Sequence, residues 1–256
     1  MNKIKLISSV VLVLIFAVTS AGCITGDTYY VGIDTDGTDP FIIQDAKTGE
    51  FSGFDVESMK WIAQHENMNI EFISMNWDNI IPSLLSGEID LIYSDMSVTE
   101  ERMELINFSK PYMTLDIVVA SNKNLNTTMD DFFTGNATIG IPSGTTSQNF
   151  VRNNFGEDYD HMVSDGIIVV YSYVDEMFSA LDNGDVQTVV FEKSAIRGYA
   201  ENSKNIYILG ETGVNEGIAV GMRKENTELL EKINHGLTDL MDSDKWIELK
   251  KKYGLN

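Results

Sequence analysis

The chain has 256 residues, of which 43% are apolar and 22% charged, and its formal net charge at pH 7 is −21. So acidic a composition argues against nucleic acid or an anionic lipid surface as a binding partner, because both carry charge of the same sign. A single cysteine excludes an internal disulfide. The length is enough for one large domain or two small ones.

The N-terminus has the pattern of a secretory signal peptide. Two lysines precede an apolar run at 6–18, and small residues at 20–22 stand directly before Cys23. The run is too short for a transmembrane helix. A cysteine directly after Ala-Gly resembles a lipobox, in which the thiol is lipidated and becomes the new N-terminus; the alternative is an ordinary signal peptide that ends near a cysteine. We expect cleavage after residues 1–22 and lipidation of Cys23, which leaves a net charge near −23.

Short β-rich runs alternate with helical patterns along the rest of the chain. Strands are expected at 30–33, 70–74, 89–93, 116–120, 138–141, 167–171, 188–191, 206–209 and 217–220. Helices are expected near 55–66, 78–86, 146–155, 174–183, 193–202, 226–242 and 244–253. The alternation predicts the α/β class with mainly parallel sheets. No shift in composition marks a linker between independent domains.

The most specific pattern is WDNIIPSLLSGEIDLIYSDMSVTEERMELINFSKPY, at residues 77–112. It contains an aromatic-Asp-x-x-Ile-Pro helix start, Gly-x-x-Asp, a short strand, Ser-x-Thr-x-Glu-Arg and Phe-Ser-x-Pro-Tyr in this order. These elements resemble the first-lobe signature of the polar amino-acid binding proteins of ABC importers, solute-binding protein family 3. The resemblance extends over nearly all of residues 29–256.

The resemblance implies a two-lobed type II periplasmic-binding-protein fold. Each lobe is expected to be a mainly parallel sheet flanked by helices, with the ligand cleft between the lobes. Lobe one would comprise residues 27–112 and 214–256, and lobe two residues 113–213. In open α/β sheets ligands bind at the carboxyl ends of strands, where free N–H groups of helix N-termini favour anions.

Three residues of the first-lobe signature are expected at the ligand. In the family, the arginine that matches Arg102 grips the α-carboxylate of the ligand, a role that suits the bidentate guanidinium. Ser97 matches the neighbouring hydroxyl position. Trp77 matches an aromatic position that stacks on the ligand in several relatives, although a core tryptophan at a helix start is the alternative.

Lobe two is expected to contribute a hydroxyl and a carboxylate. The segment 139–147, Ile-Gly-Ile-Pro-Ser-Gly-Thr-Thr-Ser, resembles the family's Val-Gly-Val-x-x-Gly-Thr-Thr and makes Thr146 a contact. The strand that ends at Glu192 has glutamate where the family usually has the aspartate that holds the ligand ammonium. The carboxylate is kept, but it is one methylene longer.

Further acidic residues near the expected cleft suggest a cationic ligand. Asp95 stands where relatives have glycine or serine, and it would repel an anion unless it pairs with a cationic group of the ligand. Asp34 and Asp36 follow the first strand and are candidates to face the cleft, although Asp-rich turns are more often structural. Thr38 replaces a common stacking aromatic. With Arg102 as one cation among these carboxylates, we expect a polar and preferably cationic amino acid.

The function implied by the resemblance is an extracytoplasmic receptor, lipid-anchored to the outer face of the cytoplasmic membrane, that presents a small amino acid to an ABC permease. No cofactor and no metal site are expected, since His65, His161 and His235 fall outside the matched motifs. One alternative is a dehydratase-type enzyme on the same scaffold, with Glu192 as the proton donor. Another is the ligand-sensing subunit of a receptor complex, which would share all of these features.

Overall fold

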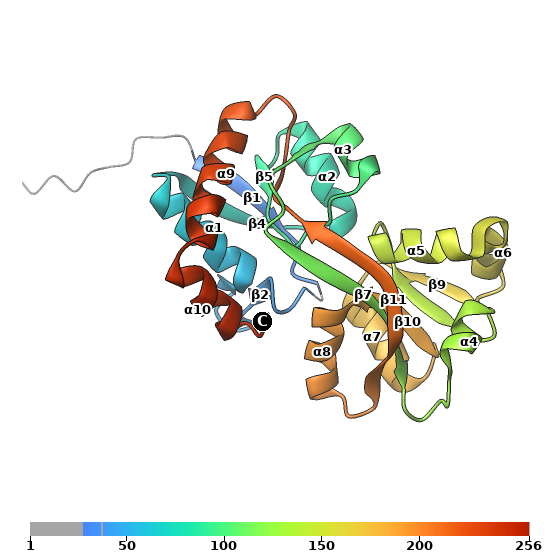
Figure 1. Cartoon of the computed structure of the whole chain (residues 1–256). Coiled ribbons are helices and arrows are strands. Elements are labelled where there is room, and N and C mark those ends of the chain that lie inside the picture. The colour runs from blue at the N-terminus through green and yellow to red at the C-terminus, as the bar shows by residue number, and fades with distance from the viewer. Residues whose placement is uncertain (1–27, 37, 256) are drawn as a thin grey trace, which may run out of the picture.

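The computed structural model describes residues 28–36 and 38–255, which form two lobes joined by two long strands (Figure 1). The expected signal peptide, residues 1–22, and the expected lipidation site Cys23 lie outside the described residues. Within the described part of the chain, no helix combines the length and the apolar character that a membrane span needs.

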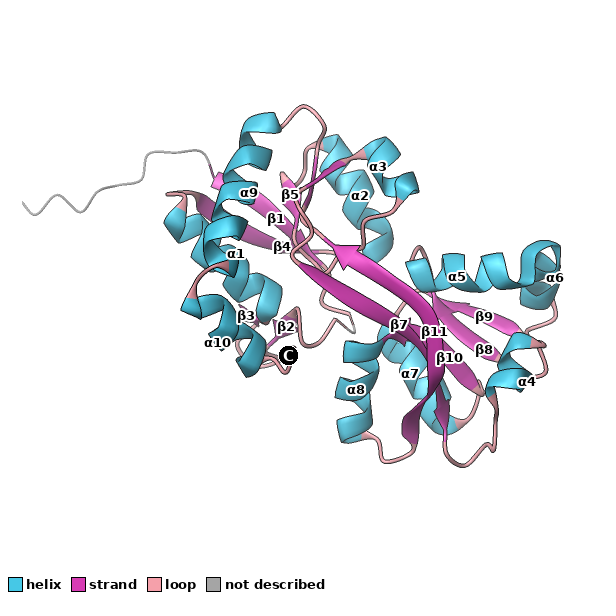
Figure 2. Cartoon of the chain, viewed as in Figure 1, coloured by secondary structure: helices cyan, strands magenta, loops and turns pink. Residues whose placement is uncertain are grey.

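Lobe one is built on a five-stranded sheet with the strand order β4-β1-β5-β12-β6. Its strands are β1 (Thr28–Ile33), β4 (Asn69–Ser74), β5 (Leu91–Ile92), β6 (Asn107–Phe108) and β12 (Gly221–Met222), and a small ladder adds β2 (Ile43–Gln44) and β3 (Phe51–Ser52). Its helices are α1 (Phe54–His65), α2 (Trp77–Ser86), α3 (Glu100–Leu105), α9 (Thr227–Met241) and α10 (Asp244–Lys252). Figure 2 shows α1, α9 and α10 on one side of this sheet and α2 and α3 on the other.

Lobe two is built on a second five-stranded sheet with the order β11-β7-β10-β8-β9. Its strands are β7 (Met113–Asn122), β8 (Ile139–Pro142), β9 (Ile168–Tyr171), β10 (Thr188–Glu192) and β11 (Ile206–Ile218). Its helices are α4 (Met129–Phe133), α5 (Thr146–Phe155), the 3₁₀ turn η1 (Gly156–Asp158), α6 (Tyr159–Ser164), α7 (Val174–Asn183) and α8 (Lys193–Asn202).

The alternation of side chains along β7 explains why helices cover both faces of this sheet. Val118 and Ala120 pack into the apolar cluster formed with α7 and α8, whereas Ile117 and Val119 pack into the cluster formed with α4, α5 and α6. Successive residues of a strand point to opposite faces, so a continuous apolar run is buried on both sides. The same logic applies to lobe one, whose α1 and α2 lie in separate apolar clusters.

The two lobes are connected by β7 and β11, which lie side by side as an antiparallel pair. The sequence predicted two separate strands, 206–209 and 217–220, where the structure has one long strand, β11. Register shifts between Ile208 and Gly210 and between Glu211 and Val214 allow the pairing to continue through the intervening turn residues. The expected lobe boundaries, at 112–115 and 213–216, fall at the start of β7 and within β11.

Both sheets are less parallel than the alternation of elements predicted. In lobe one β4, β1 and β5 pair in parallel, while β12 pairs antiparallel with β5 and β6. In lobe two β10, β8 and β9 are parallel, while β7 pairs antiparallel with β10 and β11. The antiparallel pairings come from the chain passing between the lobes, a long-range event that local patterns do not report. The short helices α4 and α6 were also missed, because neither is long enough for its apolar residues to show a helical repeat.

Candidate ligand-binding site

All seven residues that the sequence proposed as ligand contacts line one pocket between the lobes. They are Asp34, Trp77, Asp95, Ser97, Arg102, Thr146 and Glu192. From lobe one they come from the chain just after β1, β4 and β5; from lobe two they come from the start of α5 and the end of β10. Carboxyl ends of strands and N-termini of helices thus meet at the cleft, where open α/β sheets place their ligands.

Arg102 is a buried cation held from three sides. It lies in α3, where the Thr99 side chain caps the helix by accepting a hydrogen bond from the Arg102 backbone N–H at 3.1 Å. Its guanidinium donates to the Ser97 carbonyl at 2.8 Å and, across the cleft, to the Gly144 carbonyl at 3.2 Å. Its carbon Cζ lies 5.2 Å from the Trp77 ring centroid. A buried, oriented fork of this kind suits a carboxylate ligand.

Trp77 is half-buried and contributes to both the core and the cleft. It packs against the apolar cluster under α2, and its indole N–H donates to the Gly144 carbonyl of lobe two at 3.1 Å. Gly144 has a φ of 67°, and a Cβ there would stand 3.5 Å from the indole and 3.1 Å from Asp78. Glycine therefore permits both the left-handed turn and the close approach of the lobes.

Residues with hydroxyl side chains from both lobes line the same pocket as Arg102. Ser97 is buried, forms an isolated bridge to Ile218 and offers its carbonyl to Arg102. Thr146 is also buried and begins α5, whose cap is the Thr145 side chain. The neighbouring Ser147 lines the pocket, and its buried hydroxyl has no hydrogen-bond partner among the described residues. The first turn of α5 thus presents hydroxyls where a helix N-terminus favours negative charge.

Two aspartates on the lobe-one side have strongly perturbed acidity. Burial raises the pKa of Asp34 to about 7, although the hydrogen bond that Asp34 accepts from the Asp36 backbone N–H lowers this pKa. Burial, together with the negative charge of Asp34, raises the pKa of Asp95 to about 7. Asp95 also has a φ of 41°, a left-handed conformation in which aspartate is more frequent than most residues. Both groups therefore change charge near neutral pH.

Glu192 faces Asp95 from the other lobe. Burial raises the pKa of Glu192 well above its usual value, and the charge of Asp95 and a hydrogen bond between the two carboxyls raise it further. Two carboxyls that are hydrogen-bonded to each other retain a proton, because both cannot ionise without a cation between them. The pair is thus a site that a positively charged group of a ligand would occupy.

Two further acids belong to this region and were not singled out from the sequence. Asp55, fully buried in α1, accepts hydrogen bonds from the Asp95 backbone N–H at 2.6 Å and from the Tyr112 hydroxyl at 2.8 Å. Glu216, on β11, has a buried carboxylate oxygen without a partner in the described part of the chain. Its charge is the largest of those that raise the pKa of Arg102 against the lowering effect of burial. For Asp55, the one local signal of burial was its position among the apolar residues of one face of α1.

Asp36 makes a direct contact between the lobes. Its carboxylate accepts hydrogen bonds from the backbone N–H groups of Val174, at 2.5 Å, and Asp175, at 3.4 Å, and so satisfies the N-terminus of α7. Together with the contacts of Trp77 and Arg102 to Gly144, it holds the cleft narrow. The free space in the pocket is about 40 Å³. An amino acid is several times larger than this, so its entry requires the lobes to separate.

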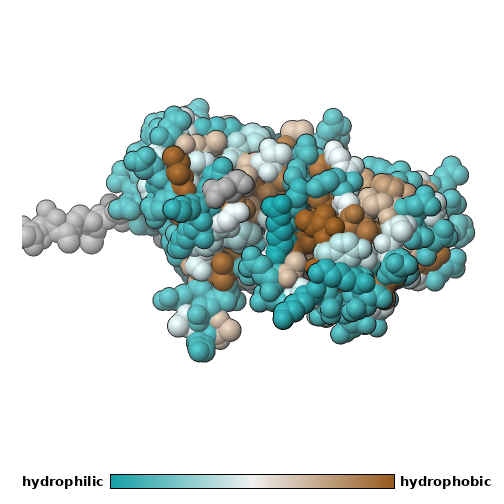
Figure 3. All heavy atoms as spheres, turned by 60° about the horizontal axis from the view of Figure 1, so that its bottom comes forward, coloured by the Kyte–Doolittle hydropathy of each residue, from teal (hydrophilic) through white to brown (hydrophobic). Residues whose placement is uncertain are grey.

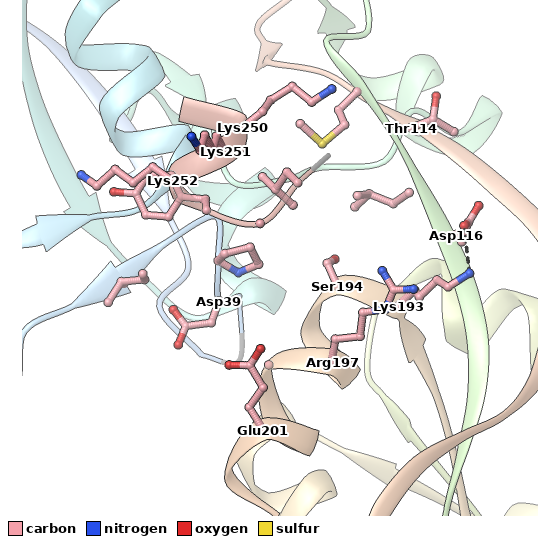
Figure 4. Close-up of a pocket in the computed structure, with 18 of the residues that line it drawn as sticks. Asp39, Thr114, Asp116, Lys193, Ser194, Arg197, Glu201, Lys250, Lys251 and Lys252 are labelled. Atoms are coloured by element: carbon pink, nitrogen blue, oxygen red, sulfur yellow. Dashed lines mark ion pairs between the residues drawn. The ribbon is translucent and has the colours of Figure 1, made fainter. Parts of the chain in front are cut away.

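A second and wider cavity lies on the other side of the lobe junction, with a volume of about 940 Å³. Figure 4 shows Lys250, Lys251 and Lys252 approaching it from lobe one, with Lys193 and Arg197 on α8 opposite. These cations are interspersed with acids, and Lys193 pairs with Asp116 at 3.5 Å. The cavity is broad, whereas the pocket around Arg102 is lined by buried polar groups. The surface drawn in Figure 3 is mostly hydrophilic, with the largest apolar area near its middle.

Comparison with known proteins identifies the relatives of this chain. Residues 30–256 match the bacterial extracellular solute-binding proteins, family 3. The histidine-binding periplasmic protein of Salmonella typhimurium (strain LT2) is 30% identical over 261 residues, covering 97% of this chain and 96% of that protein.

Two solved structures of amino-acid-binding proteins have the same two-lobed architecture. The arginine-bound form of a truncated ArgBP from T. maritima has a TM-score of 0.71 and 32% identity, covering 83% of this chain and 96% of that one. The ancestral amino acid-binding protein AncCDT-1, described as a precursor of cyclohexadienyl dehydratase, has a TM-score of 0.73 and 26% identity, covering 88% of this chain and 94% of that one. The fold is thus the type II fold that the sequence predicted.

Proposed function

The chain belongs to family 3 of the bacterial extracellular solute-binding proteins, and we propose that it captures a cationic amino acid, such as arginine, lysine or histidine, for uptake by an ABC transporter. The observation that supports a cationic ligand is the excess of acidic residues in the pocket. Four of its lining residues are acids, Asp34, Asp36, Asp95 and Glu192, and one, Arg102, is a cation. A neutral zwitterion would leave most of these buried acids to retain a proton, whereas a ligand with a second positive charge would pair with their ionised forms.

In this proposal each end of the ligand has its own partners. Arg102 binds the α-carboxylate, assisted by the hydroxyls of Ser97 and Thr146. Glu192 holds the α-ammonium, and Asp95 and Asp34 pair with the side-chain cation. Trp77 lies between these charges and covers the aliphatic part of the side chain, since an indole face accepts both methylenes and cations.

Ligand binding would act by shifting an equilibrium between open and closed lobes. The contacts that now cross the cleft come from Arg102, Trp77 and Asp36. A ligand bound to groups of both lobes adds contacts that exist in the closed form alone, so it stabilises that form. The ABC permease would then recognise the closed form. The relatives include a histidine-binding periplasmic protein and the arginine-bound form of ArgBP, which agrees with this ligand class.

Titration of the purified protein with a panel of amino acids tests the ligand class. Arginine, lysine or histidine is expected to raise the melting temperature and to bind one molecule per chain by calorimetry; at a hundredfold excess over Kd the gain is about 2.7 kcal/mol. Asp95→Ser should weaken these ligands selectively, and Glu201→Gln, an exposed acid on α8, serves as the control. Tight binding of glutamate or leucine without any response to the three cations would reject the charge argument and leave the receptor assignment intact.

A receptor is favoured over an enzyme, although one feature of the pocket suits catalysis. Glu192 is buried, and its pKa is raised well above the usual value, as a carboxylic acid that donates a proton requires. AncCDT-1, a precursor of a dehydratase, shares the fold. The histidine-binding relative and the arginine-bound ArgBP are binding proteins, which favours a receptor. Recovery of the bound ligand unchanged, in equal amount to that added, would support a receptor.

We propose that Cys23 anchors the protein to the outer face of the membrane through lipid. Two acyl chains suffice for stable anchoring, at about 0.8 kcal/mol per buried methylene. Cys23→Ala is expected to move the protein from the membrane fraction to the soluble extracytoplasmic fraction, with unchanged affinity for its amino acid. The measurement is fractionation of cells that express either form. Equal membrane retention of both forms would contradict lipidation at this residue.

A further inference from the structure

Two of the three histidines of this acidic chain meet on the outer face of lobe one, away from the cleft. His65 is the last residue of α1 and Glu66 is its C-cap, while His235 lies in α9. One side-chain donor atom from each of these three residues lies within 4.8 Å of the others. None of the three lines the pocket around Arg102. The cluster therefore has no part in the binding of the amino acid.

We propose that His65, Glu66 and His235 form a site for a divalent transition-metal ion, with Zn²⁺ as the natural probe. Two imidazoles and a carboxylate suit Zn²⁺ and its neighbours in the transition series, whereas Mg²⁺ and Ca²⁺ prefer sites made of oxygen ligands alone. Three protein ligands leave one position of a tetrahedral ion to water. The sequence predicted no metal site, because Glu66 and His235 are 169 residues apart in the chain and belong to no common motif.

A second carboxylate, that of Asp239, lies beside the cluster and adds a second negative charge to that of Glu66. Asp239, one turn after His235 on α9, has its Oδ2 atom 2.8 Å from His65 Nε2 and 3.7 Å from His235 Nε2. Glu66 is 2.7 Å from His235 Nδ1. The two carboxylates neutralise a divalent ion, and Asp239 orients His65 in the way that outer carboxylates orient metal-bound imidazoles. The nearby Lys232 is paired with Glu228 at 3.0 Å, so it does not oppose the ion.

The cluster lies where α1 and α9 are closely packed and where α1 ends. Figure 1 shows α1 and α9 side by side, and their packing depends on Gly236, next to His235. A Cβ at Gly236 would lie 2.7 Å from Ile62 and 3.3 Å from Glu66, so glycine is what lets the helices approach. The C-terminus of α1 also carries partial negative charge from its free carbonyls. The helices thus bring the donors together before any ion binds.

The donor atoms need a small adjustment to hold an ion. Ligands about 2.0–2.1 Å from a tetrahedral metal are roughly 3.4 Å apart, somewhat closer than the present limit of 4.8 Å. His235 is 66% exposed and His65 is 39% exposed, so rotation of these side chains closes the gap without movement of the helices. Glu66, whose side chain is 14% exposed, is the least exposed of the three ligands and stays in place.

Calorimetric titration with ZnCl₂ at pH 7.5 tests the site on the whole protein, purified without a histidine tag and in the absence of amino acids. The native protein is expected to bind one Zn²⁺ per chain and to melt at a higher temperature with Zn²⁺ than with EDTA. His65→Gln and His235→Gln should each weaken Zn²⁺ binding by at least tenfold, and Asp239→Asn by about tenfold. MgCl₂ and CaCl₂ should give no comparable effect.

The third histidine provides the matched control. His161 is exposed on α6 of lobe two, so His161→Gln removes one imidazole and leaves the cluster intact. Unchanged Zn²⁺ binding by this variant supports the site, provided that circular dichroism shows all variants folded. The proposal is overturned if the native protein shows no stoichiometric binding. It is equally overturned if the double variant His65→Gln, His235→Gln binds Zn²⁺ as the native protein does, which would indicate adventitious binding to surface acids.

Discussion

Replacing Arg102 by alanine is expected to lower the affinity for the preferred amino acid by about 10²–10⁴-fold. A charge-assisted hydrogen bond contributes about 1.5–3 kcal/mol, so losing a bidentate pair costs about 3–6 kcal/mol. Arg102 is the one cation among the residues that line the pocket. Its loss also leaves the carboxylates of the cleft facing the ligand carboxylate without a positive charge between them. Calorimetry with arginine or lysine measures the change.

Two further variants separate the shape of the guanidinium from its charge. Arg102→Lys keeps a positive charge but cannot form the fork, so it should bind less tightly than the native protein and more tightly than Arg102→Ala. Arg152→Ala is the control, because Arg152 lies on the surface with 51% of its side chain exposed. Binding that survives Arg102→Ala within threefold, in a folded protein, would show that the ligand carboxylate lies elsewhere.

The residues that the sequence placed at the ligand are those that belong to a contiguous motif. Arg102 and Ser97 lie in one signature segment, and the cap formed by Thr99 follows from the local pattern Thr-Glu-Glu-Arg. Thr146 stands at a strand-glycine-helix junction whose conformation depends on Gly144 and its neighbours. Local chemistry fixes the caps and turns of these elements, whereas the ligand roles of these residues were expected from the resemblance to the family.

The acids that modify these contacts could not be found in the same way. Asp55 reaches the Asp95 loop from α1, across 40 positions of the chain, and Glu216 acts on Arg102 from β11, the strand that returns between the lobes. A carboxylate on a helix or strand reads as a solvated surface residue unless its burial is known. The mixed character of both sheets was missed for the same reason, since pairing between distant strands leaves no local pattern.

The stability of the ligand-free protein is expected to fall as pH rises from 5 to 8. Asp34 and Asp95 have pKa values of about 7 in the folded protein, whereas in an unfolded chain their pKa values are near 3.8. Between these values the folded state binds more protons than the unfolded state, so the free energy of unfolding decreases with pH. The contribution is full below about pH 4 and is lost as pH passes about 7. One such group changes the free energy of unfolding by roughly 3 kcal/mol between pH 5 and pH 8.

Melting temperatures of the ligand-free protein at pH 5 and pH 8 measure this effect. A fall of about 5–10 °C is expected for a chain of this size. Asp34→Asn and Glu192→Gln should flatten the dependence, because each removes a buried group that takes up a proton. Glu201→Gln removes one exposed carboxylate and controls for the general repulsion of an acidic surface. A dependence that is equally steep in the variants would assign the effect to that general repulsion.

The affinity for a cationic amino acid should change with pH in the opposite direction. A ligand cation that pairs with Asp95 and Glu192 favours their ionised forms, so binding releases protons and strengthens as pH rises from 5 to 8. Calorimetry in two buffers of different ionisation enthalpy counts the protons released, and a neutral ligand such as glutamine serves as the comparison. If Asp95 and Glu192 share a proton in the free protein and release it when the ligand cation binds, stability should fall and affinity should rise as the pH increases. If stability falls with pH while the affinity for arginine stays constant, the carboxyls keep their protons in the complex, and the cationic end of the ligand does not reach them.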